Sequence, residues 1–190
     1  FGLLSPNKGI ENVIAALPAI LAKYPNVVYI IVGATHPHII KNDGETYRLF
    51  LQRLAHEKGV EANVIFYNRF VNPEELVQFI SAADIYISTP YWYAEEMLAD
   101  ERGALVPFSD PQALAEQVID LLGNESKRHA MRKRAYLFGR DMIWSQVARR
   151  YMKTFERARA ERRYFAQAEF AVKALDKRIG DLPPLKLDHL

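Results

Sequence analysis

The sequence contains no cysteine, no long apolar run and almost no excess of charge. Without cysteine, disulfides and thiolate metal sites are excluded, and a reducing cytoplasm is compatible with the chain. A membrane-spanning helix needs about 20 consecutive apolar residues, and no run approaches that length. The formal net charge of +2 favours neither nucleic acid nor a membrane as a partner.

The opening residues, FGLLSPNKG, have no basic stretch before an apolar run, so we expect no signal peptide. Because there is no initiator methionine, we expect this sequence to be a piece of a longer protein. Of its 190 residues, 49% are hydrophobic, which is enough for one ordinary domain with a core and an appendage.

Strand-like runs alternate with amphipathic helical runs over the first three quarters of the chain. Apolar runs rich in β-branched residues predict buried parallel strands at 26–34, 63–70, 84–88 and 103–108, after a first strand ending at 1–4. Apolar residues at helical spacing predict helices at 9–24, 44–58, 72–83, 110–122, 127–138 and from 143 onward. This alternation predicts an α/β fold: an open parallel sheet of Rossmann type with helices on both faces.

From about residue 149 the sequence changes to a long helix dense in arginine and lysine. Acids are interleaved with these bases, which favours a solvated helix over an RNA-binding or lipid-binding one. The final residues, GDLPPLKLDHL, are typical of an extended linker. We therefore assign 1–155 to the α/β domain, and 156–190 to the helix and a linker to a possible further domain.

One stretch, ADIYISTPYWYAEE, lacks a connection. DIYI is typical of a buried strand and STPYW of the end of another strand that leads into a helix, yet nothing separates them. Parallel strands need a crossover of about a dozen residues or more. Either one strand continues into the Pro90 turn, or a helical segment has been removed; composition alone favours the first.

Five pieces follow one another in a specific order from residue 1 to about residue 155: FGLLSPNKGIENVIAALPAI, VVYIIVGA, VIFYNRFVNPEELVQFISAADIYI, STPYWYAEEMLADERGALVPFSDPQALAEQVIDLL and MIWSQVARRYMKTF. Together they resemble the C-terminal, nucleotide-sugar-binding domain of GT-B retaining glycosyltransferases, group 1 or family 4. The resemblance implies a cytoplasmic, bacterial hexosyltransferase that moves a sugar from a nucleoside-diphosphate sugar to an acceptor with retention. It implies no metal and no cofactor, and an N-terminal acceptor domain as partner.

In that family a segment with a Glu-x7-Glu motif and the following helix lies between ADIYI and STPYW. This sequence lacks the segment, so we infer a junction between Ile87 and Ser88, left by a deletion or by a loop omitted from the sequence. The resemblance therefore assigns no catalytic residue, and we expect the chain alone to be inactive.

A helix that begins just after Lys8 suits a diphosphate, because its first N–H groups and the lysine ammonium attract anions. A solvent-exposed turn lysine is the alternative, and the family's nearby arginine is replaced here by Leu3. The resemblance assigns nucleotide-sugar binding to Gly2, Lys8, Gly33, Arg69 and Glu95, with His36, Glu96 and Trp92 as secondary candidates. His36 and Arg69 are equally compatible with loop and surface residues that have no such role.

A second hypothesis is a non-catalytic α/β remnant or interaction module. The absent crossover, Leu3 and the long C-terminal helix motivate it. It predicts self-association through that helix, whose Tyr151, Phe155 and Phe165 would otherwise be exposed.

Overall fold

The computed structural model describes residues 1–89 and 92–179, and the predicted linker lies mostly outside them. The chain divides into two compact units, Phe1–Ala135 and Tyr136–Leu190. The predicted boundary near residue 155 stays a prediction. No helix in the described ranges is both long enough and apolar enough to cross a membrane.

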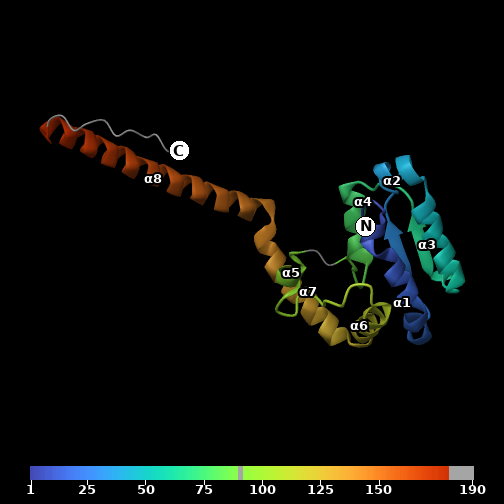
Figure 1. The fold of residues 1–190 in the computed structure, drawn as a ribbon. Coiled ribbons are helices and arrows are strands. Elements are labelled where there is room, and N and C mark those ends of the chain that lie inside the picture. Colours follow the sequence, from blue (N-terminus) through green and yellow to red (C-terminus); the bar gives the residue numbers. More distant parts are fainter. Residues whose placement is uncertain (90–91, 180–190) are drawn as a thin grey trace. The chain divides into compact units, whose positions relative to one another are not determined.

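The first unit is built on a small parallel sheet (Figure 1). Strands β1 (Tyr29–Val32) and β2 (Val64–Tyr67) pair in parallel, with Ile30 opposite Ile65. The first residues of the chain extend this sheet, because Leu4 forms a parallel bridge with Thr35. The sheet order is therefore the opening segment, then β1, then β2, which confirms the predicted parallel α/β architecture.

Helices follow the predicted positions closely. The elements of the first unit, besides the strands, are a 3-10 turn at Pro6–Lys8, α1 (Ile10–Lys23), α2 (Pro37–Asp43), α3 (Thr46–Glu57), a 3-10 turn at Glu61–Asn63, α4 (Pro73–Ala82), α5 (Ala94–Leu98) and α6 (Pro111–Gly123). Helix α7 (Glu125–Gly139) begins in the first unit and ends in the second. A 3-10 turn at Arg140–Met142 and the 36-residue helix α8 (Trp144–Ile179) follow. α3 lies on one side of the two strands and α4 on the other (Figure 1).

Two local caps explain why helices begin where the sequence predicts. The Asn72 side chain accepts a hydrogen bond from the Glu75 backbone N–H at 2.8 Å, at the start of α4. The Asp110 side chain accepts from the Ala113 N–H at 2.9 Å, at the start of α6. In both helices proline follows the cap, where its missing N–H has no helical partner to lose.

The core lies between the sheet and helices α1, α3 and α6. Its most deeply buried side chains are those of Leu4, Ile14, Leu17, Ile20 and Leu51. The α1 residues recur at helical spacing, so one face of α1 is apolar and packs inward. This packing fixes α1, whose first turn follows Lys8.

Two predicted strands are wrong. Residues 84–88 and 103–108 form no strand in the structure. Ile85 and Ile87 still pack against the core, and the Tyr86 ring lies 5.5 Å from the Phe1 ring. A strand exists only through ladder hydrogen bonds with a neighbour, and the described residues show none from either stretch to the sheet.

Candidate functional site

Three chain segments end at the same edge of the sheet. The opening segment leads to Lys8, β1 leads to His36 and β2 leads to Arg69. Because the strands are parallel, their carboxyl ends meet there. Ligands of open α/β sheets bind outside these ends, so this edge is the candidate site.

Lys8 ends a short 3-10 turn, and its side chain is exposed. Gly9, with φ of 61°, begins α1 and provides no side chain to cap it. A Cβ on Gly9 would lie 3.5 Å from the Thr89 side chain, so the chain just after the predicted junction lies beside this turn. The first N–H groups of α1 and the Lys8 ammonium therefore form a cationic end of a 14-residue helix.

Gly2 and Gly33 lie against each other, with Gly33 buried and Gly2 partly exposed. The Gly2 N–H donates to the Val32 carbonyl at 2.9 Å, and the Gly33 N–H donates to the Tyr67 carbonyl at 3.0 Å. Gly33 is buried with φ of 142°. Both glycines thus serve strand pairing, and their contact with a nucleotide sugar stays a prediction.

A polar network at the end of β1 was not predicted from the sequence. The hydroxyl of Thr35, which is 3% exposed, donates to Glu45 Oε2 at 2.5 Å. Arg48 Nε donates to the same oxygen at 3.0 Å. The hydrogen bond from Thr35, with that from Arg48, lowers the pKa of Glu45 below its ordinary value. Glu45 is therefore a fixed carboxylate at the candidate edge.

A second hydrogen bond holds α3 beside the start of α1. The Tyr47 hydroxyl donates to Glu11 Oε2 at 2.7 Å. Burial, together with this bond to a carboxylate, raises the pKa of Tyr47 far above its ordinary value. The two bonds, from Tyr47 and from Thr35, tie the first turn of α3 to two of the three segment ends.

His36 begins α2. Its Nδ1 accepts a hydrogen bond from the His38 backbone N–H at 3.1 Å, so one ring nitrogen serves as a helix cap. The ring is only partly exposed. His36 lies at the edge as predicted, with Nε2 as the ring atom left for a ligand.

Arg69 follows β2 and is held in place from two sides. Its guanidinium donates to the Tyr67 hydroxyl and forms an ion pair with Glu75 in the first turn of α4. The hydroxyl of Tyr67 donates to the same carboxylate at 2.9 Å. These contacts raise the pKa of Arg69, with the Tyr67 hydrogen bond as the main cause. The Arg69 side chain is 57% exposed, so its guanidinium is a fixed cation that faces solvent.

Glu95, Glu96 and Trp92 lie on or just before α5. All three are exposed, and Trp92 is 87% exposed with its ring 4.5 Å from that of Tyr93. Among the described residues, no hydrogen bond or ion pair joins them to Lys8 or Arg69. The structure thus brings together the segment ends and leaves the α5 residues as a separate group.

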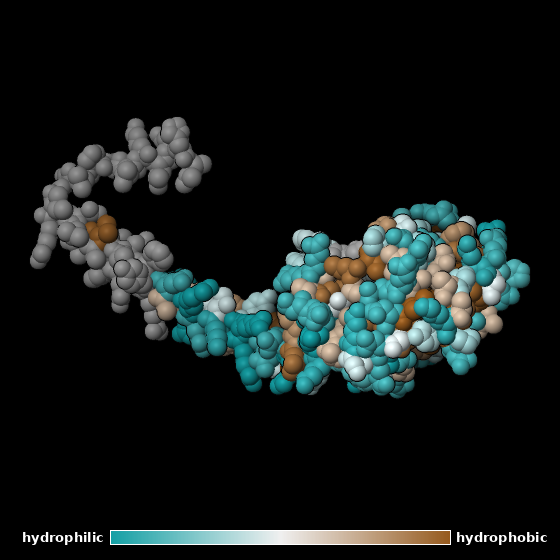
Figure 2. Space-filling view, turned by 90° about the horizontal axis from the view of Figure 1, so that it is seen from below, coloured by the Kyte–Doolittle hydropathy of each residue, from teal (hydrophilic) through white to brown (hydrophobic). Residues whose placement is uncertain are grey.

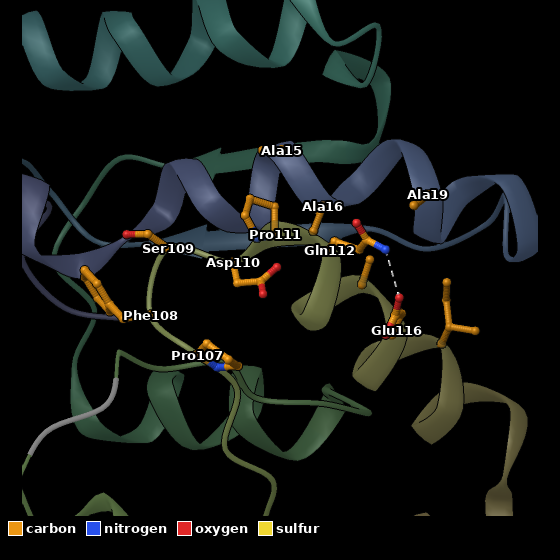
Figure 3. Close-up of a pocket in the computed structure, with 12 residues that line it drawn as sticks. Ala15, Ala16, Ala19, Pro107, Phe108, Ser109, Asp110, Pro111, Gln112 and Glu116 are labelled. Atoms are coloured by element: carbon orange, nitrogen blue, oxygen red, sulfur yellow. Dashed lines mark hydrogen bonds between the residues drawn. The ribbon is translucent and has the colours of Figure 1, made fainter.

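An open groove of about 900 Å³ lies elsewhere, between α1 and α6 (Figure 3). Its walls are Ala15, Ala16 and Ala19 on one side, and the 107–112 stretch with Glu116 on the other. The polar groups are largely engaged: Asp110 caps α6, and Gln112 donates to Glu116 at 3.1 Å. With two acids and no base among its lining residues, the groove does not suit a diphosphate.

The sequence matches the model of the family described as "Glycosyl transferases group 1" over residues 1–99. The chain therefore belongs to the group 1 glycosyltransferase family. It is also similar to Spore coat protein SA of Bacillus subtilis (strain 168), with 23% identity over 189 aligned positions. The match covers 83% of this chain and 48% of that protein, so the chain spans about half the length of the relative.

Proposed function

We propose that this chain is the donor-binding domain of a retaining GT-B glycosyltransferase that uses a nucleoside-diphosphate sugar. The observation that supports the proposal is the position of Lys8 and Arg69, each after a segment that ends at the same edge of the parallel sheet. Two cations and a free helix N-terminus suit an anionic diphosphate. We place the reaction in the bacterial cytoplasm, as the sequence predicts, with an N-terminal acceptor domain as partner.

Lys8 and the first N–H groups of α1 would bind the diphosphate. In the transition state negative charge grows on the departing diphosphate, and fixed donors aimed at it lower the barrier. Arg69, already oriented by Tyr67 and Glu75, would reach a phosphate oxygen without first losing side-chain freedom. The domain thus contributes positioning and charge stabilisation rather than a nucleophile.

We also propose that this chain alone binds the donor but does not catalyse sugar transfer. One supporting observation is the sheet face toward α4, where the paired Ile30 and Ile65 stay 44% and 47% exposed. Parallel sheets are normally covered on both faces, and the helix expected in the missing segment would supply such cover.

The test is a titration of the purified chain with UDP, GDP and ADP, followed by thermal unfolding and calorimetry. A ligand that binds only the folded state raises its stability with concentration, so at least one diphosphate is expected to raise Tm. Unchanged Tm with all three at millimolar concentration would refute donor binding.

Two variants separate a specific site from general charge. Lys8→Gln is expected to weaken diphosphate binding about tenfold, because it removes a charge-assisted contact worth about 1.5 kcal/mol or more. Lys23→Gln, at the other end of α1, removes the same charge and is expected to leave affinity unchanged. Equal losses in both variants would contradict a phosphate site at Lys8.

A further inference from the structure

The carboxylate of Glu45 is attached to the end of β1, although α2 lies between them in the chain. Its Oε2 atom lies 2.5 Å from the Thr35 hydroxyl. Thr35 is fixed in turn, because it forms the bridge with Leu4 and the next N–H, that of His36, donates to the Leu4 carbonyl at 3.0 Å. The opening segment and β2 lie on either side of β1, so the carboxylate is held at the end of the central strand.

Helix capping does not explain this position. Glu45 is the residue just before α3, yet its side chain accepts no hydrogen bond from the first turn of that helix. It accepts instead from Thr35 and Arg48, and both donors bind the same oxygen, Oε2. Across residues 1–89 and 92–179, no hydrogen-bond partner is found for the other oxygen, Oε1.

The carboxylate is held in place and is also accessible. The Glu45 side chain is 38% exposed, and that of its partner Arg48 is 23% exposed. An acceptor that is already oriented binds a hydrogen-bond donor without first losing side-chain freedom. Glu45 therefore has the properties of a ligand-binding group as well as those of a structural one.

The charge of Glu45 limits the part of a ligand that it can bind. Lys8 and Arg69 follow the two segments that flank β1, so a diphosphate bound by these cations would lie near the carboxylate. Phosphate oxygens and carboxylate oxygens are both anionic acceptors, so they repel each other. Glu45 suits a neutral part of the same ligand that donates hydrogen bonds, and the hydroxyls of a sugar ring are such donors.

The position of Glu45 in the sheet favours the ribose of the nucleotide. In dinucleotide-binding α/β sheets the phosphates lie at the helix after the first strand, and an acid after the second strand binds the ribose hydroxyls. With the opening segment counted first, α1 follows the first strand and Glu45 follows the second, which is β1. This analogy of position favours the ribose over the transferred sugar and the base.

We propose that Glu45 accepts hydrogen bonds from the ribose hydroxyls of the nucleoside diphosphate, and that Thr35 positions it. The inference rests on the donor binding proposed above. Arg48 balances the charge of Glu45, so the pair adds little net repulsion toward the phosphates. Glu45 thus makes the site selective for a nucleoside diphosphate over a diphosphate that carries no ribose.

The experiment is calorimetry of the full chain and its Glu45→Gln variant. The ligands are the tightest binder among UDP, GDP and ADP, its analogue whose ribose lacks both hydroxyls, its glucose conjugate, and inorganic pyrophosphate. Glu45→Gln is expected to weaken the nucleoside diphosphate about tenfold, because it removes a charge-assisted hydrogen bond. Pyrophosphate and the analogue without hydroxyls are expected to bind the variant at least as tightly as the native chain, because Arg48 loses its carboxylate partner.

Two further sets of variants separate this role from a structural one. Glu57→Gln removes the same charge from the other end of α3 and is expected to keep the native affinity for every ligand. Thr35→Val is expected to weaken the nucleoside diphosphate several-fold, whereas Thr35→Ser keeps the hydroxyl and is expected to restore the affinity. Circular dichroism at the temperature of the titration confirms that each variant is folded.

The outcomes distinguish this inference from the proposed function. If Glu45→Gln changes the affinity for the nucleoside diphosphate and for its analogue without hydroxyls equally, the inference is overturned while donor binding stands. A loss seen only with the glucose conjugate would assign Glu45 to the transferred sugar and would also overturn it. If the native chain binds none of UDP, GDP and ADP, the proposed function fails and the inference fails with it.

Discussion

The carbonyl oxygen of Gly2 occupies the space that a side chain on Gly33 would need. A Cβ built on Gly33 would lie 1.8 Å from that oxygen. Gly33 also has φ of 142°, in a region that residues with a side chain rarely adopt. The opening segment can therefore pair with β1 only because position 33 has no side chain.

Gly33→Ala is accordingly expected to lower the free energy of unfolding by at least about 2 kcal/mol, because overlap with backbone adds to an unfavourable φ. Chemical denaturation measures the loss. Gly139→Ala is the control, since a Cβ there meets nothing within 4 Å and no positive φ is involved. A loss at position 33 no larger than at position 139 would contradict the close contact with Gly2.

The lowered pKa of Glu45 makes the free energy of unfolding depend on pH in the acid range. Its pKa is lower in the folded chain than in the unfolded chain, mainly through the hydrogen bond from Thr35. The unfolded state therefore binds the proton first as pH falls below about 4.3, and the stabilisation present at neutral pH is lost toward lower pH.

Thr35→Val removes the main cause, so its stability is expected to fall less steeply than that of the native chain between neutral pH and pH about 3. Urea unfolding at a series of pH values measures both slopes. Glu61→Gln, at a surface glutamate near His56, is the control and is expected to keep the slope that comes from Glu45. Parallel curves for Thr35→Val and the native chain would contradict the link.

The raised pKa of Tyr47 makes the free energy of unfolding fall as pH rises in the alkaline range. Burial and the bond to Glu11 raise its pKa in the folded chain, so the unfolded chain loses the phenol proton first. Stabilisation from Tyr47 is complete below about pH 10 and is lost as pH rises above it.

Tyr47→Phe is expected to cost about 1 kcal/mol at neutral pH, the usual value of one hydrogen bond. The free energy of unfolding of this variant is also expected to decline less steeply above pH 10. The decline that remains would come from Tyr29, whose pKa is raised mainly by burial. Tyr136→Phe, which removes a phenol from the surface, is the control. An alkaline slope unchanged by Tyr47→Phe would show that the hydroxyl does not hold α3 to α1.

The sequence was sufficient to predict features that depend on near neighbours. The helix caps at Asn72 and Asp110 act within three residues, so their patterns can be recognised locally. Strands β1 and β2 were predictable because their short apolar runs stand between helical runs, although Ile30 and Ile65 are 44% and 47% exposed and the strands are not buried on both faces as predicted. The same criterion was wrong for residues 84–88 and 103–108, where apolar composition is present but no ladder partner lies alongside.

The candidate site was predicted in part. Arg69 lies at the end of a predicted strand, and His36 and Lys8 follow others within a few residues, so the parallel topology places all three at one edge. The network of Thr35, Glu45 and Arg48 was missed because it joins a strand end to a helix start across ten residues of loop and helix. Two sequence features could have indicated this network. One is a threonine just after a strand, and the other is an acid and a base three residues apart at the start of a helix.

The bond between Ile87 and Ser88 gives the last prediction, because it decides whether the missing segment is absent from the protein itself. Trypsin cleaves after lysine and arginine, and residues 70–102 contain neither before Arg102, so one peptide spans the junction. In protein isolated from its own cells, mass spectrometry is expected to find this peptide at the mass of the printed sequence. That result supports binding without turnover. Additional residues between Ile87 and Ser88 would contradict the deletion, and donor turnover with the rest of the protein would then be expected, because the segment that carries the paired glutamates in the family would be present.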